Sequence, residues 1–368
     1  MRNMFRIKRA ARHIGFSLAA AVFTATAISR VEAQEQYKQI NLISDLPGVA
    51  QLQDTNLVNA WGISFSATSP FWVSDNNSGF ATLYQVTNDA AGNPFVTKLG
   101  LQVVIPPGGG QGTPTGQAFN SAGGFNGDIF LFVSEDGTVS GWRPALGTSA
   151  ETLAPGSTNN VYKGMTLSSN ATELVLLAAN FRQATVDMYS TNGTNATLIG
   201  QFADSNAPAG YAPFGMQSIN GLIFVTFAKQ DDVKHDDIGG RGNGLIDIFD
   251  PVAGTFQRFA TGSSVGGKVH DMDSPWGVAL APSTFGRHGG QLLVGNFRSG
   301  TIMTFDAGGG FHGLLQAVND EPVTIDRLWG LKFGNGTKAG VPGTLYFSAG
   351  PDDESHGLFG SLQPVSEN

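Results

Sequence analysis

The chain has 368 residues, and 29 Asp and Glu against 21 Lys and Arg give it a formal net charge of −8 at pH 7. This acidic balance disfavours binding to nucleic acid and to anionic membrane surfaces. The absence of cysteine excludes disulfides and thioether-linked lipids. The 50 glycines follow no three-residue period, which excludes a collagen-like chain. Glycine-rich and Asn-rich turns between short Val, Ile, Phe and Tyr runs instead predict an all-β protein.

The first 33 residues predict a secretory signal peptide. A basic stretch, Arg2–Arg12, precedes the apolar run Ile14–Ile28 and the small-x-small sequence Val31–Ala33. A membrane anchor is the alternative, but about fifteen apolar residues fall short of the roughly twenty that span a bilayer. We therefore expect cleavage after Ala33 and one monomeric domain at 34–368, exported to the periplasm or the medium and not inserted in a membrane. This mature chain has a net charge of −13.

The predicted domain contains six similar units. Each unit opens on an apolar segment with a glycine, which follows an aromatic residue in most units. The marker glycines are Gly62, Gly116, Gly164, Gly215, Gly277 and Gly330, at steps of 54, 48, 51, 62 and 53 residues. A repeat of about fifty residues indicates one supersecondary unit used six times. We assign the aromatic residues of these segments to core packing between units rather than to ligand stacking.

Each marker segment is followed by a second predicted strand. These second strands are 71–76, 129–136, 174–180, 222–229, 291–296 and 344–350. Third strands follow at 81–86, 138–142, 185–189, 245–250 and 301–306, and a more polar fourth strand, such as 97–105, closes most units. Four strands in about fifty residues is typical of a β-propeller blade.

The last unit is one strand short. Its third strand, at 357–362, ends close to the C-terminus, whereas the alternating segment Tyr37–Ser44 precedes the first unit. We expect this N-terminal strand of the mature chain to complete the last blade, because closing the ring removes an exposed sheet edge. The sequence therefore predicts a six-bladed β-propeller. Two packed sheets in a β-sandwich are the alternative, which the even spacing disfavours.

Acids and amides concentrate where the second strands end. Because strands alternate in direction, these positions and the entries to the inner strands lie on one face of the ring. Oxygen ligands around a channel mouth suit a hard cation such as calcium. The predicted metal ligands are Asp75, Asn76, Glu135, Asn180, Asn296 and Asp352. Tight turns also favour Asn and Asp, so an ordinary turn remains the alternative for each residue.

The fourth unit carries an insertion, residues 229–244, which accounts for the 62-residue step. Within seven positions it holds Asp231, Asp232, His235, Asp236 and Asp237. Such a loop on a rigid scaffold could hold a cation or a general base, and an exposed charged loop is the alternative. His235 and His270 both map to the acidic face, and either is a candidate for moving a proton.

Several segments resemble an uncharacterised family of exported bacterial propellers. The segments are 41–45, 57–63, 228–231, 235–237, 274–279, 293–297 and 349–360. Some members of that family have a C-terminal sorting segment, which the tail 363–368 does not match. More distantly, the chain is similar to NHL-repeat and gluconolactonase-type six-bladed propellers, some of which use calcium at the channel mouth to hydrolyse lactones or esters. The resemblance implies the fold and leaves the reaction open.

Two functions are consistent with these residues. The first is an exported binding or scaffold protein that uses the acidic face around the channel to hold an unidentified extracellular or periplasmic ligand. The second is a calcium-dependent hydrolase or lyase, with the metal at the channel mouth and His270 or His235 as the proton carrier. Metal dependence distinguishes the two.

Overall fold

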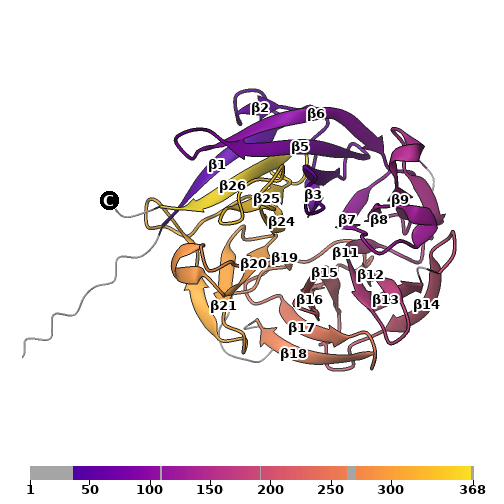
Figure 1. The fold of residues 1–368 in the computed structure, drawn as a ribbon. Coiled ribbons are helices and arrows are strands. Elements are labelled where there is room, and N and C mark those ends of the chain that lie inside the picture. The colour runs from indigo at the N-terminus through magenta and orange to yellow at the C-terminus, as the bar shows by residue number, and fades with distance from the viewer. Residues whose placement is uncertain (1–35, 108–109, 191, 263–270, 366–368) are drawn as a thin grey trace, which may run out of the picture. The chain divides into compact units, whose positions relative to one another are not determined.

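Short apolar strands joined by tight turns arrange six sheets around a central axis (Figure 1). The computed structural model describes residues 36–365 except 108–109, 191 and 263–270. Five sheets have four antiparallel strands each, and each of these five uses consecutive strands of the chain. Blade 1 is β3 (Ala60–Ser64), β4 (Phe71–Asp75), β5 (Phe80–Asn88) and β6 (Pro94–Val104), and blade 2 is β7 (Pro114–Phe119), β8 (Phe130–Ser134), β9 (Val139–Trp142) and β10 (Glu151–Ala154). The predicted six-bladed β-propeller is confirmed.

The next three blades repeat this pattern. Blade 3 is β11 (Tyr162–Ser169), β12 (Leu174–Asn180), β13 (Thr185–Ser190) and β14 (Thr197–Phe202). Blade 4 is β15 (Tyr211–Ile219), β16 (Leu222–Lys229), β17 (Leu245–Asp250) and β18 (Thr255–Thr261). Blade 5 is β19 (Pro275–Leu280), β20 (Leu292–Asn296), β21 (Ile302–Phe305) and β22 (Phe311–Leu314). In each blade the first strand lies nearest the axis (Figure 1).

Blade 6 joins the two ends of the domain. Its strands are β24 (Leu328–Phe333), β25 (Leu345–Ala349), β26 (Leu358–Pro364) and β1 (Gln36–Ser44), with the short strands β2 (Leu52–Gln53) and β23 (Gln316–Ala317) paired to β1. β1 runs antiparallel to β26, from Tyr37 opposite Pro364 to Ser44 opposite Leu358. The prediction that the N-terminal strand completes the last blade is confirmed. The edge of β26 is therefore covered within the same chain.

The inner strands approach one another too closely for side chains at the marker glycines. A Cβ atom at Gly215 would lie 2.1 Å from the carbonyl oxygen of Trp276 on the neighbouring blade, and one at Gly116 would lie 2.4 Å from the backbone nitrogen of Met165. Both distances are far below van der Waals contact, so only glycine allows this spacing. The repeated glycine thus marks the innermost strand of each blade.

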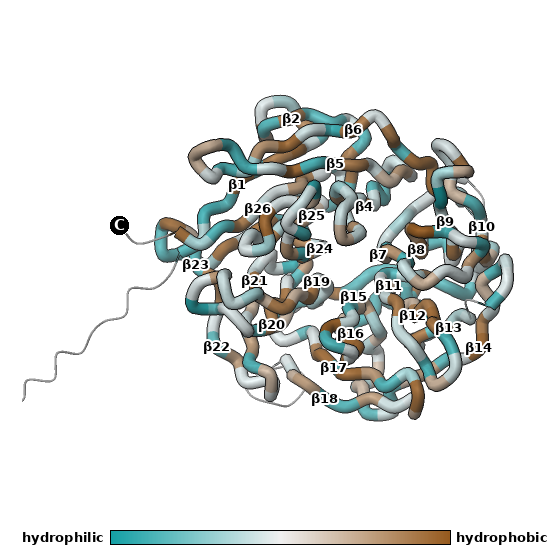
Figure 2. Tube along the Cα trace, viewed as in Figure 1, coloured by the Kyte–Doolittle hydropathy of each residue, from teal (hydrophilic) through white to brown (hydrophobic). Residues whose placement is uncertain are grey.

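Hydrophobic side chains fill the space between blades. One buried cluster comprises Trp61, Val161, Phe181, Ala212, Phe214, Ala228, Phe297 and Trp329. Within it the rings of Trp61 and Trp329 stack with centroids 3.6 Å apart. Hydrophobic and hydrophilic residues are interspersed along outer strands such as β6 (Figure 2). The assignment of the marker-segment aromatics to the core agrees with this packing. Among the described residues no helix has the length and apolar character needed to cross a membrane.

Candidate functional site at the channel mouth

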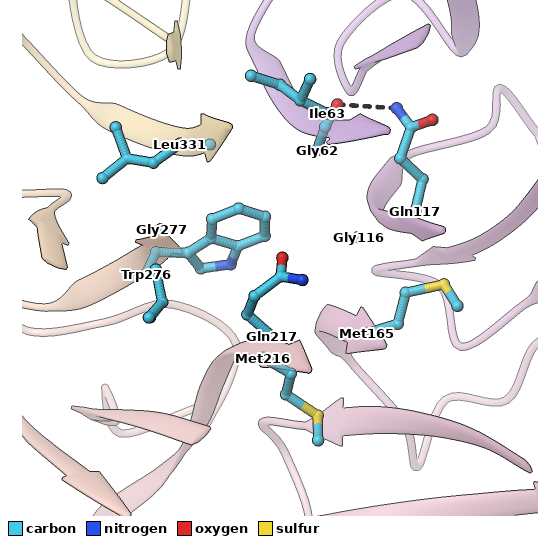
Figure 3. A pocket seen from close by; sticks show the side chains of 12 residues that line it. Gly62, Ile63, Gly116, Gln117, Met165, Met216, Gln217, Trp276, Gly277 and Leu331 are labelled. Atoms are coloured by element: carbon cyan, nitrogen blue, oxygen red, sulfur yellow. Dashed lines mark hydrogen bonds between the residues drawn. The ribbon is translucent and has the colours of Figure 1, made fainter. Parts of the chain in front are cut away.

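The central channel is too narrow to hold a ligand. Its cavity measures about 30 Å³, which is room for roughly one water molecule. The side chains of Trp276 and Gln217 project into it, and the Gln117 Nε2 donates a hydrogen bond of 2.8 Å to the Gly62 carbonyl across neighbouring inner strands (Figure 3). Any ligand-binding surface around the axis therefore lies at a mouth of the channel, where the loops meet.

A buried lysine organises the mouth on the predicted face. Lys163 lies on β11, and only 2% of its side chain is exposed. Its ammonium contacts the Glu135 Oε1 at 2.5 Å and the Asp236 Oδ1 at 3.0 Å, and it lies 5.3 Å from the ring centroid of Trp61. Burial by itself lowers the pKa of Lys163, but the two carboxylates outweigh burial and raise the pKa above its ordinary value. The lysine is therefore charged at neutral pH.

Amide side chains extend this polar cluster across the mouth to blade 6. The Asn76 Nδ2 donates to the Glu135 Oε2 at 3.0 Å, and the Asn59 Nδ2 donates to the Asn76 Oδ1 at 3.2 Å and to the Glu354 Oε1 at 3.0 Å. The Trp329 Nε1 donates to the Asn59 Oδ1 at 3.0 Å. The network therefore connects the loops of blades 6, 1 and 2 to the aromatic core beneath them.

The insertion of blade 4 brings a histidine to the same cluster. The His235 Nδ1 lies 3.0 Å from the Asp236 Oδ1, and this hydrogen bond raises the pKa of His235 and lowers that of Asp236. The neighbouring Asp237 forms a bidentate pair with Arg298, at 2.7 and 2.8 Å. This pair attaches the insertion to the loop that follows β20. The insertion is therefore held by specific contacts over the channel mouth.

Two predicted metal ligands, Asn180 and Asn296, point into their own blades. Asn180 accepts hydrogen bonds from the backbone of residues 161 and 183, and donates to Asp187 at 2.9 Å. Asn296 accepts from the backbone of residue 273 and donates to the Thr301 hydroxyl at 3.1 Å. These amides stabilise turns, which is the ordinary alternative that the sequence left open.

Two further predicted ligands also lie apart from the cluster. Asp75 is fully buried, and neither of its carboxyl oxygens has a hydrogen-bond partner among the described residues. Burial raises the pKa of Asp75 well above its ordinary value, which the nearby Thr82 hydroxyl offsets only in part. Asp352 has 83% of its side chain exposed and lies 3.9 Å from the His356 Nε2. His270 lies outside the described residues. Of the predicted site residues, the structure brings together Asn76, Glu135 and His235.

Three side chains at the mouth have atoms of the types that bind metals. Oxygen or nitrogen atoms of Glu135, His235 and Asp236 lie within 4.8 Å of one another. The ammonium of Lys163, however, already contacts two of the three. A divalent cation among these atoms would lie beside a buried positive charge, which is strongly unfavourable in a site of low dielectric. With Lys163 in place, the cluster does not fit calcium.

A pocket of about 420 Å³, lined largely by residues with polar side chains, opens next to the ion pairs, between the loops of blades 2 and 3. Its lining includes Glu135, Asp136, Thr158, Arg182 and His235. Arg182 donates to the Thr158 carbonyl at 2.6 Å but forms no ion pair with a carboxylate in the part of the chain that the structure describes. His235 is 38% exposed at the pocket edge.

Sequence reasoning missed Lys163 and Arg182. It included Asp236 among the residues of the insertion that could hold a cation or act as a general base, but it did not group Asp236 with Glu135. One signal for Lys163 was present in the repeat. The residue before the marker glycine is aromatic in four units, but it is Lys163 in the third. A charged residue at a position that otherwise fills the core indicates a buried ion pair. Arg182 has no comparable signal, because it follows a strand end like many exposed loop residues.

Protonation of Glu354 is expected to change stability between pH 4.5 and 7. Burial raises the pKa of Glu354 from 4.5 to about 7. A carboxyl whose pKa rises on folding stabilises the fold fully below pH 4.5, and this contribution is lost as the pH rises through about 7. Relative to Glu354→Gln, which does not titrate, the wild type should lose free energy of unfolding over this interval. Urea unfolding of both proteins at pH 4.5 and pH 8 measures the change. If the difference in free energy of unfolding between the two proteins were the same at both pH values, the result would contradict the burial of this carboxyl.

The fold and the site together define a six-bladed β-propeller with a closed channel and a polar loop face. No protein-family model matches the sequence. The chain is 30% identical over 344 residues to the Uncharacterized protein L690 of Acanthamoeba polyphaga mimivirus, an alignment that covers 87% of this chain and 84% of the relative. The chain belongs to the family of that protein. It is also 28% identical over 343 residues to the Uncharacterized protein R648 of the same virus, covering 87% of this chain and 78% of the relative.

Solved structures share the architecture at low sequence identity. Virginiamycin B lyase from Staphylococcus aureus superposes with a TM-score of 0.51 at 10% identity, covering 90% of this chain and all of that chain. A gluconolactonase from Xanthomonas campestris gives a TM-score of 0.51 at 12% identity, covering 84% of this chain and 87% of that chain. At this identity the similarity concerns the fold, and the predicted likeness to gluconolactonase-type propellers is confirmed to that extent. The curated relatives are viral, so the predicted bacterial exported family stays a prediction.

Proposed function

We propose that the protein binds a small polar molecule that carries a carboxylate, in the pocket between the loops of blades 2 and 3. The observation that carries this proposal is the guanidinium of Arg182, which lines the pocket without a carboxylate partner in the described part of the chain. An arginine of this kind is a natural partner for a carboxylate, because two parallel N–H donors match the two oxygens.

The size of the pocket supports a small ligand. Its volume of about 420 Å³ lies in the range of ordinary small-molecule sites. Acids and hydroxyls also line it, among them Glu135, Asp136 and Ser157. A ligand with a carboxylate for Arg182 and an ammonium group for these acids would match both charges. An amino acid is the simplest molecule of this class.

Three related probes test the proposal. L-glutamine has both charges, N-acetyl-L-glutamine only the carboxylate, and L-glutamine methyl ester only the ammonium. Each lost charge should weaken binding by about tenfold, the equivalent of one charge-assisted hydrogen bond. The variant Arg182→Met should bind L-glutamine and its methyl ester equally. Isothermal titration calorimetry measures all affinities, and absence of binding by all three probes would refute the proposed ligand class.

A pair of tryptophan variants shows whether binding occurs in this pocket. Thr158→Trp places a large side chain in the lining, whereas Asn159 belongs to the same loop but does not line the pocket. Thr158 contacts Arg182 through its backbone carbonyl, which the substitution retains. Thr158→Trp should abolish binding and Asn159→Trp should leave it unchanged. Equal binding by both variants would place the site elsewhere.

An acid–base enzyme of the hydrolase or lyase class is the second candidate. The hydrogen bond from His235 to Asp236 favours it, since a carboxylate orients the imidazole ring and leaves its Nε2 for a substrate. In an ester hydrolysis, His235 would take a proton from water as the water attacks the carbonyl, and would return the proton to the leaving alcohol. Conversion of L-glutamine methyl ester to L-glutamine and methanol that is lost in His235→Gln, with binding retained, would favour this candidate.

We further propose that residues 1–33 direct export and that the mature protein acts outside the cytoplasm as a monomer. The basic stretch, the apolar run and the small-x-small sequence support export. The net charge of −13 predicted for the mature chain supports a ligand other than nucleic acid or an anionic membrane.

A further inference from the structure

The position of Lys163 is unusual within the repeat. The residue before the marker glycine is Trp61, Phe214, Trp276 and Trp329 in blades 1, 4, 5 and 6, and Lys163 occupies this position in blade 3. Three of these four aromatic side chains are fully buried. Lys163 therefore enters a place where an apolar ring would fit, and its charge requires partners there.

The partners come from two other blades. Glu135 follows the second strand of blade 2, and Asp236 belongs to the insertion of blade 4. Their carboxylates contact the ammonium at 2.5 and 3.0 Å. The Trp276 Nε1 donates to the Lys163 carbonyl at 3.0 Å, which fixes the backbone of β11 beneath the side chain. The ammonium is thus held at the point where loops of three blades converge.

The surroundings of the ammonium have the composition of a cation site. Ligand atoms of Glu135, Asp236 and His235 lie within 4.8 Å of one another, and two of them already contact the Lys163 Nζ. Two carboxylates and one imidazole are a donor set that Zn²⁺ accepts. The positive charge of the lysine disfavours a metal ion at this place.

We propose that the ammonium of Lys163 takes the place of a metal ion at the channel mouth, so that the loops are organised by an internal cation instead of a bound one. Lys163 is a positioning residue in this arrangement. It holds the carboxylate of Glu135 and the His235–Asp236 pair in fixed orientations at the edge of the pocket, while its own ammonium is shielded from a ligand.

Removing the charge should convert the cluster into a metal site. In Lys163→Met an unbranched apolar side chain replaces the lysine, and two carboxylates and a histidine remain without a cation. We expect this variant to bind Zn²⁺ at least about a hundredfold more tightly than the wild type, because metal binding restores the lost charge balance. Isothermal titration calorimetry with Zn²⁺ alone measures the affinities. Lys163→Met/His235→Gln should lose the gain, since one ligand is then missing.

Lys332 provides a matched control. It also lies on an innermost strand, β24, where burial lowers its pKa and its ammonium lies 5.8 Å from the ring centroid of Phe65. It forms no ion pair with a carboxylate within the described residues. Lys332→Met should therefore bind Zn²⁺ no more tightly than the wild type. Lys163→Arg, which retains a cation, should behave in the same way.

Two outcomes would overturn the proposal. The first is a folded Lys163→Met whose affinity for Zn²⁺ is as low as that of the wild type. The second is a wild type that itself binds Zn²⁺ with the high affinity expected of the variant, and loses this binding in His235→Gln. If Lys163→Met does not fold without metal, Lys163→Gln is titrated in its place, and the same two outcomes apply to it. Neither outcome depends on the glutamine probes, so the test is independent of the proposed ligand.

Discussion

Replacing Trp329 with alanine is expected to lower the free energy of unfolding by about 3 to 5 kcal/mol, the usual cost of truncating a large buried aromatic side chain. Trp329 stacks on Trp61 at 3.6 Å and on Phe297 at 3.9 Å between ring centroids. It also donates the hydrogen bond that holds Asn59 beneath the channel mouth. Chemical unfolding followed by circular dichroism measures the change.

The control for this variant is an exposed aromatic residue. Phe95 on β6 is 59% exposed, and Phe95→Ala should change the free energy of unfolding by less than about 0.5 kcal/mol. If Trp329→Ala and Phe95→Ala had the same effect, the stacked rings would contribute little to the stability of the propeller. A large effect confined to Trp329 would show that the blades depend on the aromatic cluster at the axis.

Replacing Glu135 with alanine should lower the free energy of unfolding by about 3 kcal/mol, because it leaves the buried ammonium of Lys163 with one carboxylate partner in place of two. The Asn76 amide also loses its acceptor. Asp353 is the control, since it forms an ion pair with Arg327 on the same face but is 83% exposed. Asp353→Ala should change the free energy by less than about 1 kcal/mol.

A double variant separates the loss of the ion pair from other effects of the Glu135 substitution. In Lys163→Met/Glu135→Ala no unpaired ammonium remains, so the combined loss of stability should be smaller than the sum of the two single losses. Additive losses would contradict a direct interaction between the two side chains. Urea unfolding of the four proteins completes the cycle.

The placement of the strands followed from the repeat. Six marker glycines at similar intervals predicted the number of blades, and the alternating segment before the first unit predicted how the ring closes. Both predictions depend on local pattern and on the rule that sheet edges must be covered. The distance of 2.1 Å from a Cβ at Gly215 to a neighbouring carbonyl oxygen explains why the glycine recurs. The face on which His235 and Glu135 lie was also predictable, since strands alternate in direction.

The composition of the candidate site was predicted only in part. Asn180 and Glu135 both lie at the ends of predicted second strands, yet Asn180 turns into its own blade and Glu135 points to the mouth. The direction of a side chain at a strand end depends on which hydrogen bonds the adjoining loops offer, and those loops are distant in the sequence. Pattern alone could therefore place these residues on a face but could not group them.

The sequence by itself determined the class of fold, the number of blades and the strand that closes the ring, because each of these depends on repeated local features. Tertiary structure alone decided that Lys163 meets Glu135 and Asp236, which lie 28 and 73 residues away along the chain. The reason is that a buried charge takes its partners from whichever blades converge on it. That convergence is a property of the closed ring and not of any one repeat.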